Sequence, residues 1–167
     1  MGVPRLVSLF PSPKGEISKR QEYCAVTASN RDLCVSALLV GDYESECALL
    51  RGIFRDAGWR LWEAPNRLRA LATLRQHPVE VVISEKDGLR WNWRRLFNDL
   101  RDLAQPPQLI VTSRTANDSL WAEVLNIGAY DVLPQPFHRD EVERVVAAAR
   151  RQFEGDLRPR VAAVGAA

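Results

Sequence analysis

Val81-Val82-Ile83-Ser84-Glu85 is a short apolar run that ends in a carboxylate. A run of this length, rich in β-branched residues and bounded by turn signals, is typical of a strand that is buried on both faces. In open parallel sheets, ligands bind at the carboxyl ends of the strands. The sequence therefore places Glu85 where a functional acid would lie.

Similar apolar runs alternate with amphipathic helical patterns along most of the chain. The spacing predicts strands over residues 35–40, 59–64, 79–84, 109–112 and 130–133. It predicts helices over residues 44–57, 67–76, 91–103, 117–127 and 139–153. Asn66 is a good N-cap for the second helix, and Gly128 is a good terminator for the fourth. Five strands that alternate with five helices favour an α/β fold, with a parallel sheet, helices on both faces and right-handed crossovers.

The charge balance and the cysteines limit the classes of partner and compartment. The chain has 23 basic and 21 acidic residues and a net charge of +2. This near balance does not indicate binding to nucleic acid or to an anionic membrane. No apolar run approaches the roughly 20 residues of a membrane span. The three cysteines lack metal-ligand spacing, and an odd number without a secretory signal favours a reducing compartment. We therefore expect a cytoplasmic protein that binds neither nucleic acid nor membrane.

Composition divides the chain into three parts. Residues 1–33 are interrupted by prolines and are expected to form an extended or disordered arm. An alternative is that the short apolar run Leu6-Val7-Ser8-Leu9-Phe10 docks on the domain or on a partner. Residues 34–153 hold the alternating pattern and should form the folded domain. Residues 154–167 are rich in Arg, Pro, Ala and Gly and are expected to form a tail.

Four segments, in order, resemble one family. They are Leu38-Leu39-Val40-Gly41-Asp42, Val81-Val82-Ile83-Ser84-Glu85, Ile110-Val111-Thr112-Ser113 and Gly128-Ala129-Tyr130-Asp131-Val132-Leu133-Pro134-Gln135-Pro136-Phe137. Together they make residues 34–153 similar to a response-regulator receiver domain. The resemblance implies a CheY-like, flavodoxin-type fold, which is a three-layer sandwich around a five-stranded parallel sheet.

The resemblance also implies a phosphorylation site, from which this sequence departs. In the family, two acids after the first strand and an acceptor Asp after the third hold Mg²⁺ through oxygen ligands. The metal and a Lys after the fifth strand neutralise the phosphoryl group, a hydroxyl residue then bonds the phosphate, and an aromatic residue turns inward. The corresponding positions here are Gly41 and Asp42 for the acid pair, Glu85 for the acceptor, Gln135 for the lysine, Val132 for the aromatic residue and Thr112 for the hydroxyl.

Two of these changes argue against phosphoryl transfer. The extra methylene of Glu85 displaces the carboxylate by more than a bond length, and in-line transfer is sensitive to such displacements. Gln135 in place of Lys removes a cation from the developing charge, a loss that typically costs ~10²-fold or more in rate. We therefore expect no enzymatic activity and no cofactor.

Three interpretations of the acidic residues stay open. Asp42 and Glu85, with an oxygen from Asp87, could form a residual, weak Mg²⁺ site. They could instead be a structural acid pair that Lys86, Arg114 or water neutralises. In the third interpretation, Glu85 imitates the phosphorylated state by placing one negative charge close to Thr112. The Gln135-Pro136 bond is expected to be cis, as in the family. The Gln135 amide could be presented to Glu85, or the loop could keep its shape without its chemistry.

The fourth helix, the fifth strand and the last helix form the usual partner and dimer surface in the family. Here Trp121, Leu125, Tyr130 and Val132 fall on the first two of these elements, and exposed Trp and Tyr favour interfaces. Trp121 could instead cap an edge of the core.

These observations predict a stand-alone, degenerate receiver domain in bacterial signalling. It would act by phosphorylation-independent binding to a protein partner, which could be a kinase, a regulator or a second copy in a homodimer. The alternative is an unusual phosphoacceptor that uses Mg²⁺ and a phosphodonor at the corner formed by Asp42 and Glu85. A small enzyme or ligand binder would need an organised polar set, and the sequence shows no catalytic triad or Gly-rich phosphate loop.

Overall fold

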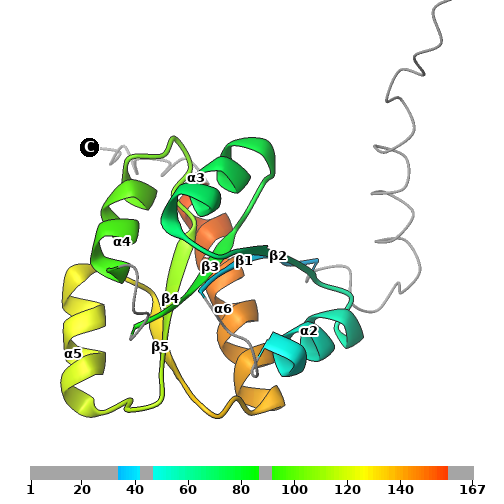
Figure 1. Ribbon diagram of the computed structural model, residues 1–167, viewed down its shortest axis with the longest axis vertical. Helices are drawn as coiled ribbons and strands as arrows, with labels where there is room; N and C mark the ends of the chain where they lie inside the picture. The colour runs from blue at the N-terminus through cyan, green and yellow to red at the C-terminus, as the bar shows by residue number, and fades with distance from the viewer. Residues whose placement is uncertain (1–33, 42–46, 87–91, 158–167) are drawn as a thin grey trace, which may run out of the picture. The chain divides into compact units, whose positions relative to one another are not determined.

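Five parallel strands form one sheet in the order β2-β1-β3-β4-β5. The computed structural model describes residues 34–41, 47–86 and 92–157. The strands are β1 (Ser36–Val40), β2 (Arg60–Ala64), β3 (Val81–Glu85), β4 (Gln108–Ser113) and β5 (Asp131–Pro134). The helices are α2 (Cys47–Asp56), α3 (Arg67–Gln76), α4 (Trp93–Arg101), α5 (Asp118–Ile127) and α6 (Arg139–Leu157). The predicted three-layer α/β architecture is confirmed (Figure 1).

The two faces of the sheet bury two separate apolar clusters. On one face, α2 and α6 cover residues such as Leu39 and Ile83; on the other, α3, α4 and α5 cover residues such as Leu38 and Val82. These four side chains are at most 2% exposed. Burial on both faces explains why β1 and β3 are continuous apolar runs rather than alternating ones.

Local signals fix several helix ends, and those at Asn66 and Gly128 were predicted. The side chain of Asn66 caps α3 by accepting a hydrogen bond from the backbone N–H of Arg69 at 3.0 Å. Asn117 caps α5 in the same way, through the N–H of Leu120 at 2.9 Å. Gly128 ends α5 in the left-handed conformation with φ 101°, which favours glycine.

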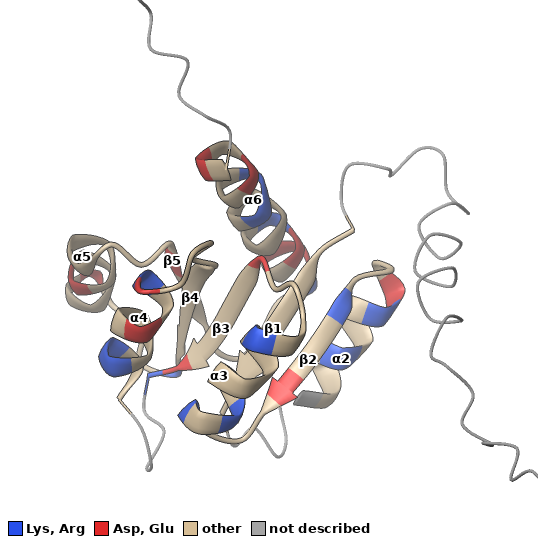
Figure 2. Cartoon of the chain, turned by 90° about the horizontal axis from the view of Figure 1, so that it is seen from above, with Lys and Arg blue, Asp and Glu red and all other residues tan. Residues whose placement is uncertain are grey.

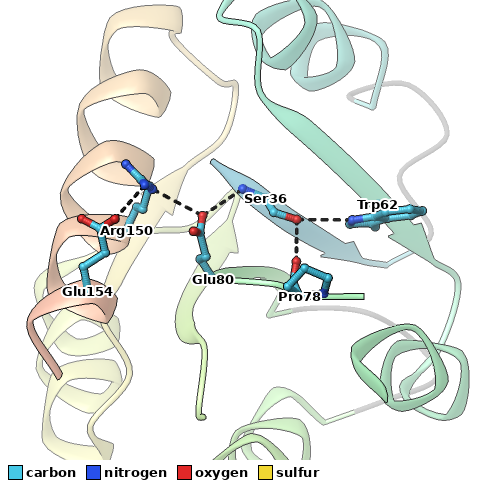
Figure 3. Close-up of polar contacts among 6 residues, drawn as sticks. All are labelled: Ser36, Trp62, Pro78, Glu80, Arg150 and Glu154. Carbon is cyan, nitrogen blue, oxygen red and sulfur yellow. Dashed lines mark hydrogen bonds and ion pairs between the residues drawn. The ribbon is translucent and has the colours of Figure 1, made fainter. Parts of the chain in front are cut away.

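Polar side chains join the amino ends of the strands to α6 (Figure 3). The Glu80 carboxylate accepts a hydrogen bond from the backbone N–H of Ser36 at 3.0 Å and lies 3.5 Å from Nε of Arg150. Arg150 also pairs with Glu154 at 2.7 Å. The Ser36 hydroxyl donates to the Pro78 carbonyl at 2.8 Å. Glu80 thus links β1 to the last helix.

The last helix continues beyond its predicted end. We predicted an end near residue 153 and a tail from 154, but α6 runs to Leu157. The added turn is held to the sheet because Gln108 at the start of β4 donates a hydrogen bond to Asp156 at 2.8 Å. The predicted arm over residues 1–33 and the rest of the tail lie outside the described residues.

Ion pairs connect neighbouring helices of the layer formed by α3, α4 and α5. Arg67 of α3 pairs with Asp99 of α4, and Arg94 of α4 pairs with Glu123 of α5. In the described residues, no helix is both long and apolar enough to cross a membrane.

Candidate functional site

The candidate site lies at the carboxyl ends of β3 and β4. Glu85 ends β3 and pairs in register with Thr112 of β4. The backbone N–H of Lys86 donates to the Thr112 carbonyl at 2.8 Å, which continues the pairing one residue beyond the strand. Thr112 is fully buried and Glu85 is half-buried. The sheet therefore brings together the predicted acceptor position and the predicted hydroxyl position.

Gln135 reaches this corner from the end of β5. Its backbone N–H donates to the Ser113 carbonyl at 2.9 Å, and its side-chain nitrogen donates to Thr112 Oγ1 at 3.1 Å. The side chain is 7% exposed, and Oε1 accepts no hydrogen bond from the residues that the structure describes. Presentation of the amide to Glu85 was one of two possibilities, and the amide nitrogen donates to Thr112. The Gln135-Pro136 bond is cis, as predicted.

The predicted metal residues are only partly described. Asp42 and Asp87 lie outside the described residues, so the residual acidic pocket stays a prediction. Gly41 is described, and its backbone N–H donates to the Ala64 carbonyl at 3.1 Å. Within the described ranges, no three His, Cys, Asp or Glu residues group closely enough to hold a metal ion. Hard-oxygen ligands for Mg²⁺ are therefore not assembled by this part of the chain.

Val132 corrects one prediction about the partner surface. It was predicted both as the equivalent of the aromatic switch residue and as a surface residue, yet its side chain is only 1% exposed. Val132 packs under α4 and α5, while the next residue, Leu133, packs under α6. Because β5 is buried on both faces, Val132 does not present its side chain to a partner.

The other predicted surface residues differ in exposure. Leu125 is 52% exposed, as the outward orientation predicted. Trp121 packs against the apolar cluster, and its indole N–H donates to the Asp131 carboxylate at 2.9 Å. Of the two interpretations offered for Trp121, the structure favours the cap on the core edge. Tyr130 is half-buried against the α6 side.

Asp131 shapes the electrostatics of this surface. Its Oδ1 accepts hydrogen bonds from the Trp121 indole and from the Val132 backbone N–H at 2.8 Å. Burial, and then the nearby Asp131 charge, raise the pKa of the Tyr130 phenol above its usual range. The phenol therefore keeps its proton at neutral pH and stays a hydrogen-bond donor.

The sequence analysis did not identify a second polar region, which lies at the amino ends of the strands. Trp62 stacks on His77 with ring centroids 3.7 Å apart, and its indole N–H donates to the Ser36 hydroxyl at 3.3 Å. This region adjoins the network of Ser36, Glu80 and Arg150. Glu80, an acid directly before an apolar strand, could have indicated this region. Its partner Arg150, however, is 70 residues away in the chain, so the pair could not be predicted.

The comparisons with known proteins agree with this geometry. No protein-family model matches the chain. It is 30% identical over 121 residues to the transcriptional regulatory protein ZraR of Klebsiella oxytoca, an alignment that covers 69% of this chain. The chain spans 26% of the length of that curated relative.

Solved structures of response regulators are also similar to this chain. One, described as a two-component system response regulator/GGDEF domain protein, matches with a TM-score of 0.64 and 27% identity, over 72% of this chain and 51% of that one. The chemotaxis response regulator CheY4 of Vibrio cholerae matches with a TM-score of 0.62 and 18% identity, over 70% and 99% of the two chains.

The parallel sheet, its strand order and the corner at the carboxyl ends are those of a receiver-type domain. More particularly, the domain has the receiver fold of two-component response regulators. The family resemblance predicted from the four sequence segments is confirmed.

Proposed function

We propose that this domain acts in bacterial signal transduction by binding another protein, without being phosphorylated and without catalysing a reaction. One observation carries the proposal: the hydroxyl of Thr112 already holds a buried hydrogen bond from Gln135. In the family this hydroxyl bonds the incoming phosphate, and a cation stands where Gln135 stands here. A neutral amide offers no charge to a phosphoryl group, so the corner favours one resting arrangement.

The interaction would use the surface formed by α5, β5 and α6. Leu125 is a large apolar side chain exposed on α5, and the Tyr130 phenol, which is half-buried against the α6 side, stays a donor. An exposed leucine suits the centre of a protein–protein contact. The partner would be a kinase, another regulator or a second copy of the chain. The proposed location is the cytoplasm, where such signalling partners lie.

The competing function is an unusual phosphoacceptor at Glu85, since Glu85 still occupies the carboxyl end of β3 next to Thr112. Beryllofluoride with Mg²⁺ mimics a phosphoryl group and distinguishes the two. We expect no change in the backbone amide resonances of Glu85, Lys86 and Thr112 when both are added to the ¹⁵N-labelled full chain. Saturable shifts at these amides, lost in Glu85→Ala, would overturn the proposal.

A second experiment tests whether the fixed charge of Glu85 has a role. If Glu85 imitates the phosphorylated state, Glu85→Gln should weaken binding to the partner and Glu85→Asp should keep most of it. Equal affinity of all three proteins would remove that role, while leaving phosphorylation-independent binding intact. Leu125→Asn is the matched surface variant. It should weaken binding whether position 85 carries Glu, Gln or Asp.

A further inference from the structure

The helix layer formed by α3, α4 and α5 is divided by charge. Together α3 and α4 carry six arginines, whereas only two acids, Asp99 and Asp102, lie on or directly after them. Residues 115–138, which include α5 and β5, contain three acids and no lysine or arginine. In Figure 2 the charged residues of α3 are all blue, and those of α5 are red. One end of the layer is therefore basic and the other acidic.

Each end also exposes a leucine on the outside of its helix. Leu68 of α3 is 74% exposed and Leu125 of α5 is 52% exposed, more than any other large apolar side chain in the described residues. Arg69 and Arg75, both exposed on α3, form no ion pair within the described part of the chain. A basic face with an apolar centre thus lies at one end, and an acidic face with an apolar centre at the other.

These two faces cannot meet within one molecule. The helix α3 packs on β1 and β2, at one edge of the sheet, and α5 packs on β5, at the opposite edge. The helix α4 lies between them and pairs with both, through Asp99 to α3 and through Arg94 to α5. In the described part of the chain, Glu123 of α5 is already paired with Arg94, whereas Arg69 and Arg75 of α3 and Asp118 of α5 form no ion pair. The charges of Arg69 and Arg75 can therefore meet that of Asp118 only in another copy.

The chain's own ends do not supply a complement for the basic face. Residues 1–33 contain five basic and three acidic residues, and residues 158–167 contain two arginines and no acid. Both segments therefore carry a net positive charge, like α3. The α5 face of a second copy, in contrast, offers opposite charge and an exposed leucine, which is the complement that the α3 face needs.

We propose that the chain self-associates head to tail, with the α5 face around Leu125 of one copy docked on the α3 face around Leu68 of the next. The proposal rests on the proposed function in taking α5 as a docking surface, and it names the partner as a second copy. A contact between two different faces is heterologous, so it extends into a row of copies instead of closing as a symmetric pair. One leucine on each face gives a small contact, which belongs with weak, transient interfaces.

Sedimentation velocity on the purified full chain tests this, over about 1 μM to about 1 mM, a range that covers weak association. We expect the weight-average sedimentation coefficient to rise with concentration at low salt and to rise much less at about 1 M salt, where charges are screened. Leu68→Ala with Arg69→Glu disables the basic face, and Leu125→Asn with Asp118→Lys disables the acidic face. Each should keep the wild-type circular dichroism, because all four residues are exposed.

Mixing the two disabled proteins gives the decisive result. Each alone should stay monomeric, whereas an equimolar mixture should form a dimer and nothing larger, because only one competent pair of faces remains. Leu49→Asn is the control. Leu49 is 46% exposed on α2, which covers the opposite face of the sheet from α3 and α5, so this substitution should leave the assembly unchanged.

Three outcomes would overturn the inference: a monomeric wild type at all concentrations, assembly that the Leu68 variant retains, or two disabled proteins that do not complement each other. Beryllofluoride with Mg²⁺ separates this failure from that of the proposed function. Head-to-tail assembly that appears only with these additives would uphold the contact and reject phosphorylation independence. A monomeric wild type would reject the contact and leave Leu125 free to bind a different protein.

Discussion

The side-chain nitrogen of Gln135 donates a hydrogen bond of 3.1 Å to the hydroxyl of Thr112, and both residues are buried. The two side chains come from neighbouring strand ends, 23 residues apart in the chain. This contact joins the two positions at which the family resemblance predicts a lysine and a phosphate-binding hydroxyl. Under the proposed function, the contact is structural and the corner does not react.

Removing the Gln135 amide should therefore weaken the fold. Gln135→Ala removes this buried hydrogen bond, and we expect the free energy of unfolding to fall by about 1–2 kcal/mol, the cost of a lost buried hydrogen bond. Urea denaturation followed by circular dichroism measures this. Gln76→Ala, at an exposed position on α3, is the control. Equal stability of the two variants would contradict a structural role for the contact.

The link between α6 and the strand ends should contribute to stability in the same way. Arg150 is 13% exposed in its side chain and Glu80 is 21% exposed, so Arg150→Ala leaves a largely buried carboxylate short of a partner. We expect a loss of about 1–3 kcal/mol in unfolding free energy. Arg151→Ala removes the same kind of side chain from the next, exposed position and should change stability little. A similar loss in both variants would show that general charge, and not this link, is responsible.

Two glycines should respond to alanine in opposite directions. Gly128 has φ 101°, and a Cβ there would lie 3.4 Å from Cζ of Phe97, so Gly128→Ala should cost about 1–2 kcal/mol. Gly52 lies within α2 with no neighbour within 4 Å of an added Cβ, so Gly52→Ala should stabilise the protein by about 0.5–1 kcal/mol. Thermal unfolding of both proteins checks the signs. A Gly128→Ala variant as stable as the wild type would disprove the left-handed cap.

Asp99 predicts a dependence of stability on pH. The Arg67 guanidinium, by hydrogen bonding and then by charge, holds the pKa of the Asp99 carboxyl below its usual range. The unfolded chain then binds this proton at a higher pH than the folded one, since a free Asp titrates at about pH 3.9. The stabilising effect of Asp99 is thus present above about pH 4 and is lost as the pH falls through the folded-state pKa.

The measurement compares wild type with Asp99→Asn by urea denaturation between pH 7 and pH 3. We expect their difference in stability to shrink below about pH 4. In an Arg67→Ala background, Asp99→Asn should change stability much less, because the pair is already broken. A difference that stays constant with pH in the wild-type background would exclude this ion pair as its source.

The fold could be predicted from the sequence because its signals are local. The cap at Asn66 and the left-handed end at Gly128 depend on a few neighbouring residues, and the apolar run before Glu85 needs no partner to be identified as a strand. The position of Gln135 at the corner followed from the family resemblance. Its hydrogen-bond partner did not, because that choice depends on how β5 aligns with β4.

Two further features could not be predicted from the sequence, because both depend on tertiary packing. Val132 was placed on the partner surface because the family resemblance implies a surface at the fifth strand, but both Val132 and Leu133 are buried, under different helices. The pairing of Glu80 with Arg150 joins residues that only the tertiary fold brings together. Long-range contacts of this kind leave no periodic pattern in the chain.

The burial of the central strands on both faces has a consequence for how the sheet aligns. Side chains alternate along a strand, so a shift of one residue would exchange Val82 and Ile83 between two cores of similar apolar character. Apolar patterning alone does not penalise that slip. The polar groups at the strand ends do, because a shifted β3 would separate Glu80 from the N–H of Ser36. The correct register of this sheet is therefore specified by its few polar positions, while its many apolar ones supply the driving force for burial.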